Sequence, residues 1–324
     1  MVYTNLGRTG LRVSKLCLGT MNFGNTVDEK TAHEVMDYAR EVGINFFDTA
    51  NMYGGKSGWG ACETMIGNWF AKGGGRREDT VITTKFGGKI SESKNPNEEP
   101  GVSLYKMRRH LEASLKRLKT DHVEIYMTHG QRPSNWREIM EAAQALVYGG
   151  KIDYFATNGL PEFELALAQN EAEKRGFLGI AYEQHAYSLL NRGVELGFLD
   201  AIGRLGIGLT ILSPQNGGLL SSGVFEMPNI NLDEETEARL KKYHALCSDI
   251  GHKVSHVTLA WIMCNPNVTC PLIGVETIQH IEDNLKALEI KLADDVLKAI
   301  DEIFPPINIG FNFQKYFKVQ RNKF

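Results

Sequence analysis

Strand-like and helix-like segments alternate along the whole 324-residue chain. Helical periodicity predicts helices near residues 29–42, 61–71, 104–118, 135–149, 161–175, 194–205, 234–250 and 255–264, and short apolar runs lie between them. Such alternation is typical of parallel strands joined by helices, and eight of these strands close into a (β/α)8 TIM barrel of the α/β class. Because no linker rich in Pro, Gly or Ser divides the pattern, we expect one barrel domain over residues 1–324, with a C-terminal tail from about residue 305.

The first residues predict a β-hairpin that precedes the barrel. Val2–Leu6 and Val13–Leu16 flank the turn sequence Gly7-Arg-Thr-Gly10. We expect this hairpin to close the floor of the barrel, with Leu16–Gly19 as the first barrel strand.

Six of the apolar runs end in a polar residue. These residues are Asp48, Lys85, His129, Asn158, Gln184 and Ser213. In a parallel barrel the C-terminal ends of all strands lie at one mouth. The sequence therefore predicts that these side chains converge on a single pocket.

Composition limits the classes of partner. A net charge of -3 gives no general attraction to nucleic acid or to anionic lipid. The chain has no run of about 18 apolar residues and no basic-then-apolar leader, so we expect a cytoplasmic protein that does not enter a membrane. The five cysteines are scattered without CxxC spacing, which favours reduced thiols over disulfides and predicts no metal site.

Three of the predicted mouth residues, together with Tyr53, can cooperate in proton transfer. Tyr53 lies just past Asp48, and a neighbouring Lys85 ammonium would stabilise its phenolate and lower its pKa toward neutrality. Asp48 would keep Lys85 protonated and oriented. His129 could hydrogen-bond an oxygen that gains charge as a carbonyl is reduced. Such a site delivers a proton and needs a hydride donor.

The chain resembles an aldo-keto reductase from the opening hairpin almost to its end. The motifs that carry the resemblance are Leu18-Gly-Thr-Met-Asn-Phe-Gly24, Phe47-Asp-Thr-Ala-Asn-Met-Tyr-Gly54, Thr84-Lys-Phe-Gly87, Tyr126-Met-Thr-His129, Thr157-Asn158, Gln184 with Asn191-Arg192, Ser213-Pro214, and Gly274 through Asp283-Asn284. The resemblance implies that Tyr53 is the general acid, that Lys85 and Asp48 tune it, and that His129 orients the substrate carbonyl.

The resemblance also implies a nicotinamide dinucleotide at the mouth. It places the nicotinamide amide against residues 157, 158 and 184, the pyrophosphate along residues 213–220, where Gly217 and Gly218 allow close approach, and the adenosine at residues 274–284. The implied cofactor residues are Thr20, Met21, Thr157, Asn158, Gln184, Leu212, Ser213, Pro214, Gln215, Asn216, Gly217, Leu219, Gly274, Glu276, His280, Asp283 and Asn284. No GxGxxG motif follows a predicted strand, so a Rossmann cofactor site is not supported.

Three positions depart from the family pattern. Leu212 replaces an aromatic residue that stacks on the nicotinamide ring, and Thr157 replaces a serine. Glu276 stands where the family often has Arg or Lys for a 2′-phosphate, so we expect NAD(H) to be favoured over NADP(H). Two alternatives stay open: Glu276 as a partner of the helix dipole, and His280 facing water instead of adenosine.

The predicted substrate is a small carbonyl or alcohol compound. The chain is similar to bacterial family members that act on ketosugars, and Asn22 and Trp59 would suit a polyol by hydrogen bonding and ring stacking. A second hypothesis comes from regulatory subunits of voltage-gated potassium channels, which also resemble aldo-keto reductases. On it the chain would bind nicotinamide as a sensor with little turnover. The aromatic and basic tail at residues 308–324 predicts docking on the barrel or on a second subunit of a homo-oligomer, with terminal disorder as the alternative.

Overall fold

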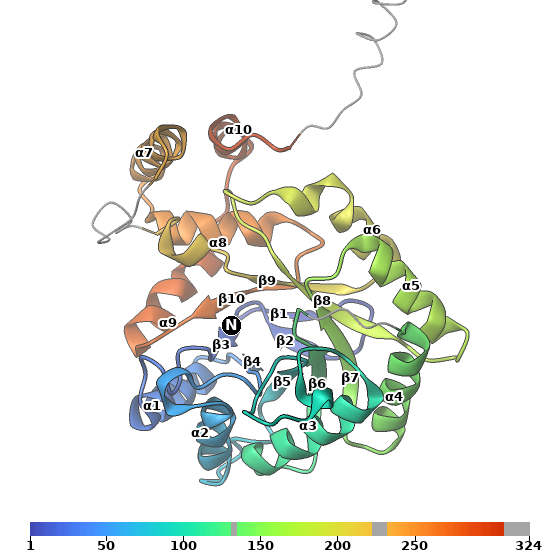
Figure 1. Cartoon of the computed structure of the whole chain (residues 1–324). Coiled ribbons are helices and arrows are strands. Elements are labelled where there is room, and N and C mark those ends of the chain that lie inside the picture. Colours follow the sequence, from blue (N-terminus) through green and yellow to red (C-terminus); the bar gives the residue numbers. More distant parts are fainter. Residues whose placement is uncertain (131–134, 222–231, 308–324) are drawn as a thin grey trace, which may run out of the picture.

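The computed structural model describes residues 1–130, 135–221 and 232–307. Its centre is a closed barrel of eight parallel strands, in the order β10-β3-β4-β5-β6-β7-β8-β9 (Figure 1). The strands are β3 (Cys17–Gly19), β4 (Phe46–Asp48), β5 (Val81–Phe86), β6 (Val123–Thr128), β7 (Ile152–Asn158), β8 (Ile180–Ala186), β9 (Gly208–Leu212) and β10 (Cys270–Gly274). The predicted (β/α)8 barrel is confirmed.

Helices surround the barrel and two more lie outside the ring. The ring contains α1 (Glu29–Glu41), α2 (Ala61–Phe70), α3 (Leu104–Leu118), α4 (Trp136–Tyr148), α5 (Glu162–Glu173), α6 (Phe198–Leu205), α8 (Val254–Cys264) and α9 (Ile278–Leu285). Helices α7 (Glu234–Asp249) and α10 (Asp294–Ile303) pack side by side beyond α8, where Tyr243 meets the Phe304 ring edge to face at 5.4 Å (Figure 1). The sequence predicted α7 but not α10. The tail expected at residues 308–324 lies outside the described residues.

Capping side chains explain several helix boundaries. Asp28 accepts a hydrogen bond from the Thr31 amide at 2.8 Å and begins α1, and Ser103 begins α3 in the same way. The helix predicted near residues 161–175 begins one residue later, because Pro161 is the N-cap residue of α5. Helix α6 begins only at Phe198 because residues 193–196 form a separate 3-10 turn. The other described 3-10 turns are η1 (Gly55–Ser57), η2 (Pro96–Glu98), η4 (Asn216–Gly218) and η6 (Lys286–Glu289).

The N-terminal hairpin closes the floor as expected. Strands β1 (Tyr3–Asn5) and β2 (Arg12–Ser14) pair antiparallel, and the turn packs against the start of β9. Gly7 has a φ of +56°, and a Cβ there would lie 2.3 Å from the Gly208 nitrogen, so only glycine fits. Arg8 fixes the same turn by donating to the Leu205 carbonyl at 2.8 Å.

Two further findings concern the membrane and the thiols. Within the described ranges, no helix is long and apolar enough to cross a membrane. All five cysteines are free, and four of them are buried.

Candidate functional site

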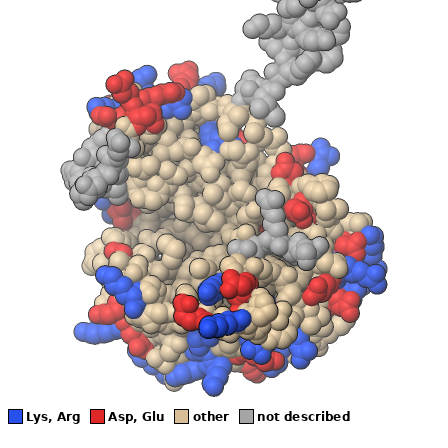
Figure 2. Space-filling view, in the orientation of Figure 1, with Lys and Arg blue, Asp and Glu red and all other residues tan. Residues whose placement is uncertain are grey.

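A cavity of about 720 Å³ opens at the mouth formed by the C-terminal ends of the strands. On this face the molecule is hollowed, and most of the surface around the hollow is uncharged (Figure 2). The predicted site residues that line it are Thr20, Met21, Asn22, Asp48, Tyr53, His129, Asn158, Gln184, Leu212, Ser213, Pro214, Gln215, Gly217, Gly274, Glu276, His280 and Asn284. The convergence expected from the strand ends is therefore present.

Six predicted residues do not line this cavity. Lys85 is fully buried behind its wall, and Thr157 is equally buried. Trp59 is 46% exposed on the loop before α2 and stands apart from the wall. The others are Asn216, Leu219 and Asp283.

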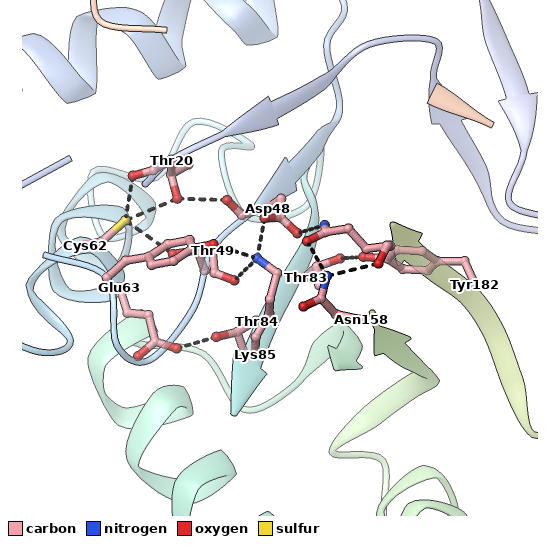
Figure 3. Close-up of polar contacts among 12 residues, drawn as sticks. Thr20, Asp48, Thr49, Cys62, Glu63, Thr83, Thr84, Lys85, Asn158 and Tyr182 are labelled. Atoms are coloured by element: carbon pink, nitrogen blue, oxygen red, sulfur yellow. Dashed lines mark hydrogen bonds and ion pairs between the residues drawn. The ribbon is translucent and has the colours of Figure 1, made fainter. Parts of the chain in front are cut away.

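The innermost polar contacts join Asp48, Lys85 and Tyr53. The Lys85 ammonium forms an ion pair with Asp48 Oδ1 and also donates to the Thr49 carbonyl at 3.1 Å (Figure 3). Its third contact is the Tyr53 hydroxyl, at 3.2 Å. Asp48 ends β4, Lys85 lies within β5 and Tyr53 follows β4, so adjacent strands hold all three.

Burial sets the protonation of these groups. Burial alone would lower the pKa of Lys85, but the charge of Asp48 and the Tyr53 contact raise it above its usual value. Burial also raises the pKa of Tyr53, and Lys85 only partly offsets that rise. The sequence predicted a net lowering for Tyr53. That prediction is wrong, because loss of solvent raises the pKa of Tyr53 more than the ammonium lowers it.

His129 completes this group. Its ring meets the Tyr53 ring edge to face, with centroids 5.6 Å apart. Burial, helped by the charge of Lys85, lowers the pKa of His129 to about 3. The imidazole is therefore neutral at physiological pH. Its Nδ1 is buried and has no hydrogen-bond partner among the residues that the structure describes.

A chain of amides links this group to the neighbouring wall. Gln184 donates from Nε2 to Asp48 Oδ2 at 2.9 Å, and Asn158 donates from Nδ2 to the Gln184 carbonyl at 3.0 Å. Thr157 faces the opposite way, where its hydroxyl is hydrogen-bonded to Glu183. Glu183 Oε1 also accepts from the Leu160 amide at 2.9 Å, which holds the end of β7.

The segment after β9 offers backbone groups to the cavity. Ser213 and Gly217 have φ values of +51° and +67°, so the chain turns sharply here. A Cβ built on Gly217 or on Gly274 would meet no atom within 4 Å, because each backbone borders open space. Thr258 of α8 anchors the segment by donating to the Leu220 carbonyl at 3.3 Å.

The far end of the cavity carries Glu276. The Thr26 hydroxyl donates to Glu276 Oε1 at 2.5 Å, which connects the loops after β3 and β10. The Glu276 amide donates to His280 Nδ1 at 3.2 Å. Asn284 reaches back to the His280 carbonyl at 2.7 Å, whereas Asp283 forms an ion pair with Lys253 at 2.8 Å.

The sequence predictions missed four wall residues. These are Gly19, Leu259, Leu272 and Ile273. The apolar ones lie on a helix or strand whose pattern predicts only core packing, so no local signal identifies them. Residues 131–134, which follow His129 closely, lie outside the described ranges.

The chain is similar to several known proteins along most of its length. Residues 15–304 match the model of the aldo/keto reductase family. The chain is 48% identical over 314 residues to the uncharacterized oxidoreductase YrpG of Bacillus subtilis, an alignment that covers 94% of this chain and 96% of that protein. It is 31% identical over 329 residues to a probable voltage-gated potassium channel subunit beta of Oryza sativa, with 94% and 96% covered. It is also 28% identical over 337 residues to Protein tas of Escherichia coli, with 94% and 97% covered.

Proposed function

Because the chain belongs to the aldo/keto reductase family, we propose that it transfers a hydride between a nicotinamide dinucleotide and the carbonyl or alcohol group of a small molecule. The contact of Tyr53 with the buried pair of Lys85 and Asp48, at the wall of the mouth cavity, carries the proposal. The nicotinamide cofactors used by this family supply the hydride when bound. The residues of the chain itself must then supply the proton.

Tyr53 is the proton donor in this proposal. Its raised pKa keeps the hydroxyl protonated at physiological pH, as an acid must be before it acts. Lys85 stabilises the phenolate that forms when the proton leaves, and Asp48 keeps Lys85 charged. Neutral His129 can donate a hydrogen bond to the carbonyl oxygen without competing for the proton.

The cavity wall fits an extended dinucleotide. Asn158 and Gln184 present amides that match the donors and acceptors of a carboxamide. Gly217 and Gly274 leave their backbones open to the cavity, which suits close approach of phosphate oxygens. Leu212 provides an apolar face in place of an aromatic one.

We further propose that NAD(H) is favoured over NADP(H). The Glu276 carboxylate lines the cavity and is held by Thr26 at 2.5 Å. A carboxylate there repels a 2′-phosphate and can accept a hydrogen bond from a free ribose hydroxyl.

Fluorescence titration with NADH and NADPH tests both proposals. We expect NADH to bind the wild type more tightly, and Glu276→Arg to shift the preference toward NADPH by about tenfold or more, because a charge-assisted bond to phosphate replaces a repulsion. Glu282→Arg is the matched control, since Glu282 is exposed on α9, which begins just after Glu276, and does not line the cavity. Equal binding of the two dinucleotides by wild type would contradict the preference, and absence of any binding would contradict the proposed function.

For the substrate we propose a polyhydroxylated carbonyl compound such as a ketosugar. The polar side chain of Asn22 lines the cavity and can hydrogen-bond a hydroxyl group. Trp59, which was also expected to contact the substrate, gives no such support because it is not among the residues that line the cavity. Saturable turnover of ketoses with NADH is the expected result. Turnover of simple aromatic aldehydes alone would contradict this substrate class.

The second candidate function is that of a nicotinamide-binding regulatory or sensor subunit. The similarity to a probable potassium channel subunit beta over 94% of the chain favours it. Tight dinucleotide binding with negligible single-turnover oxidation of bound NADH, across ketoses and aldehydes, would support this alternative over the reductase.

A further inference from the structure

A buried histidine outside the catalytic group lies between two loops of the mouth. His110 of α3 is 3% exposed. Its Nδ1 lies 3.0 Å from Asn51 Nδ2 and its Nε2 lies 3.0 Å from Glu98 Oε2. Both ring nitrogens are therefore engaged by side chains from outside its own helix.

The partners determine which nitrogen carries the proton. An amide N–H of Asn51 donates to Nδ1, so Nδ1 is unprotonated, and Nε2–H donates to the Glu98 carboxylate. Burial lowers the pKa of His110, and the charges of Lys106 and Arg117 act in the same direction against Glu98. His110 is therefore a neutral imidazole with one fixed tautomer.

Asn51 belongs to the turn that carries Tyr53. It lies between Asp48 and Tyr53, is 1% exposed, and its backbone amide donates to the Lys85 carbonyl at 3.1 Å. The Tyr53 amide donates to the Ala50 carbonyl at 3.1 Å and closes the same turn. A displacement of Asn51 would therefore displace the backbone next to both Lys85 and Tyr53.

Glu98 belongs to the segment between β5 and α3. It is 8% exposed in η2, and its amide donates to the Asn95 carbonyl at 2.9 Å. Lys106 binds the next carbonyl, that of Glu99, and the Gly101 amide returns to the Gly87 carbonyl at 2.9 Å. The whole segment is thus tied to α3 and to the end of β5, one residue past Phe86.

We propose that His110 is a positioning residue, which acts through Asn51 to hold the Tyr53 turn and through Glu98 to hold the segment after β5 in one common arrangement. The role in catalysis rests on the proposed reductase function. A buried polar triad is no more stable than apolar packing of the same shape, but its directional bonds select one geometry. Small displacements of a reacting group reduce rates strongly, so that geometry is what catalysis requires.

His110→Phe tests the proposal, because phenylalanine retains a ring of similar size and loses both hydrogen bonds. We expect kcat with NADH and 4-nitrobenzaldehyde to fall about tenfold or more, while the dissociation constant of NADH changes less than about threefold. Hydrogen exchange should become faster in residues 49–55 and in residues 91–101 alike. Glutamine offers one hydrogen-bond acceptor and one donor, as the neutral imidazole does. His110→Gln should therefore recover part of kcat and slow the hydrogen exchange of both segments relative to His110→Phe.

His33→Phe is the matched control. His33 is a similarly buried histidine, 8% exposed on α1, whose Nε2 lies 2.9 Å from the Met65 carbonyl and which touches neither loop. The His33→Phe variant should leave kcat and the hydrogen exchange of both segments unchanged. If His110→Phe does not fold, Glu98→Ala removes the same link from the loop side and should give both effects in weaker form.

The outcomes separate the two proposals. Unchanged kcat in folded His110→Phe, or faster exchange confined to α3, would overturn the positioning role. Exchange effects in both segments of a protein that binds no dinucleotide would support the link between the loops and reject the reductase function instead.

Discussion

The two ends of the barrel interior are built by the same strands but bury opposite kinds of side chain. At the floor, Leu6 of the hairpin packs with Phe46, Ile125 and Tyr182 in an apolar cluster that is fully buried. At the mouth, two residues further along β4, the chain buries the carboxylate of Asp48.

The difference separates stability from chemistry. Apolar burial at the floor stabilises the fold by about 25 cal/mol per Å² of surface removed from water. Burial of the Lys85 and Asp48 charges costs desolvation that their attraction must offset, so this pair adds little net stability. The barrel can therefore hold reactive groups in a dry site because its other end provides the stability.

The largest effect is expected from Tyr53→Phe, which alters only the mouth. If Tyr53 is the proton donor, as proposed, its replacement should lower kcat by about 10²–10⁴-fold, since the ring remains and only the hydroxyl is removed. Steady-state kinetics beside calorimetry checks this, with an unfolding temperature close to that of wild type. A variant that keeps more than about a third of the wild-type kcat would show that another group delivers the proton.

Lys85→Met should reveal the cost of burying an unpaired charge at the mouth. It leaves Asp48 buried without its cation, so we expect a loss of about 3–5 kcal/mol in the free energy of unfolding. The double variant Lys85→Met with Asp48→Asn removes both charges and should recover most of that stability while staying inactive. Urea unfolding of the two variants measures this. Equal instability of both would show that packing, not the unpaired charge, explains the loss.

Ile125→Ala makes the opposite change, at the floor. A cavity in the fully buried cluster should cost about 2–5 kcal/mol of stability. Measured well below its unfolding temperature, kcat should stay within about twofold of wild type, because Ile125 belongs to the floor cluster and does not line the mouth cavity. A large fall in kcat would mean that floor packing controls the geometry of the mouth.

A further effect is expected from Glu183→Gln, through the pH dependence of stability. Burial raises the pKa of Glu183 from its usual 4.5 to about 8, so the folded state binds more protons than the unfolded state between these values. Stability from this group is complete below pH 4.5 and is lost as pH rises to about 8. Urea unfolding across this range should show a flatter profile for the variant than for wild type. His129 contributes the opposite slope below its usual pKa of 6.5 in both proteins and cancels in the difference; parallel profiles would show that Glu183 is ionised in the fold.

Local sequence signals were sufficient for the barrel and for most of the mouth. The C-terminal ends of the strands in a parallel barrel all lie at one mouth, so the polar residues that follow six apolar runs were expected to lie close together. Five of them line one cavity: Asp48, His129, Asn158, Gln184 and Ser213. Helix starts also depend on local residues. Asp28 caps α1, because backbone donors at a helix end need a nearby acceptor.

Contacts between residues that are far apart in the sequence could not be predicted in this way. Helix α10 packs on α7, and this contact is made across more than forty residues of chain. Thr157 sits beside Asn158 in sequence, yet the pleat of β7 turns its hydroxyl to Glu183 and away from the cavity. His110 carried no motif, because its partners come from two separate loops.

The sequence by itself determined the barrel, the hairpin at its floor and the residues at its mouth. Hydrophobic periodicity, and the residues that follow each strand, are local properties of the chain. The tertiary structure alone decided how these residues ionise and what holds them. Whether Lys85 lowers the pKa of Tyr53 depends on how much solvent both lose, and burial prevails. Desolvation is a property of the assembled fold, set by atoms from many distant segments, and no short stretch of sequence contains it.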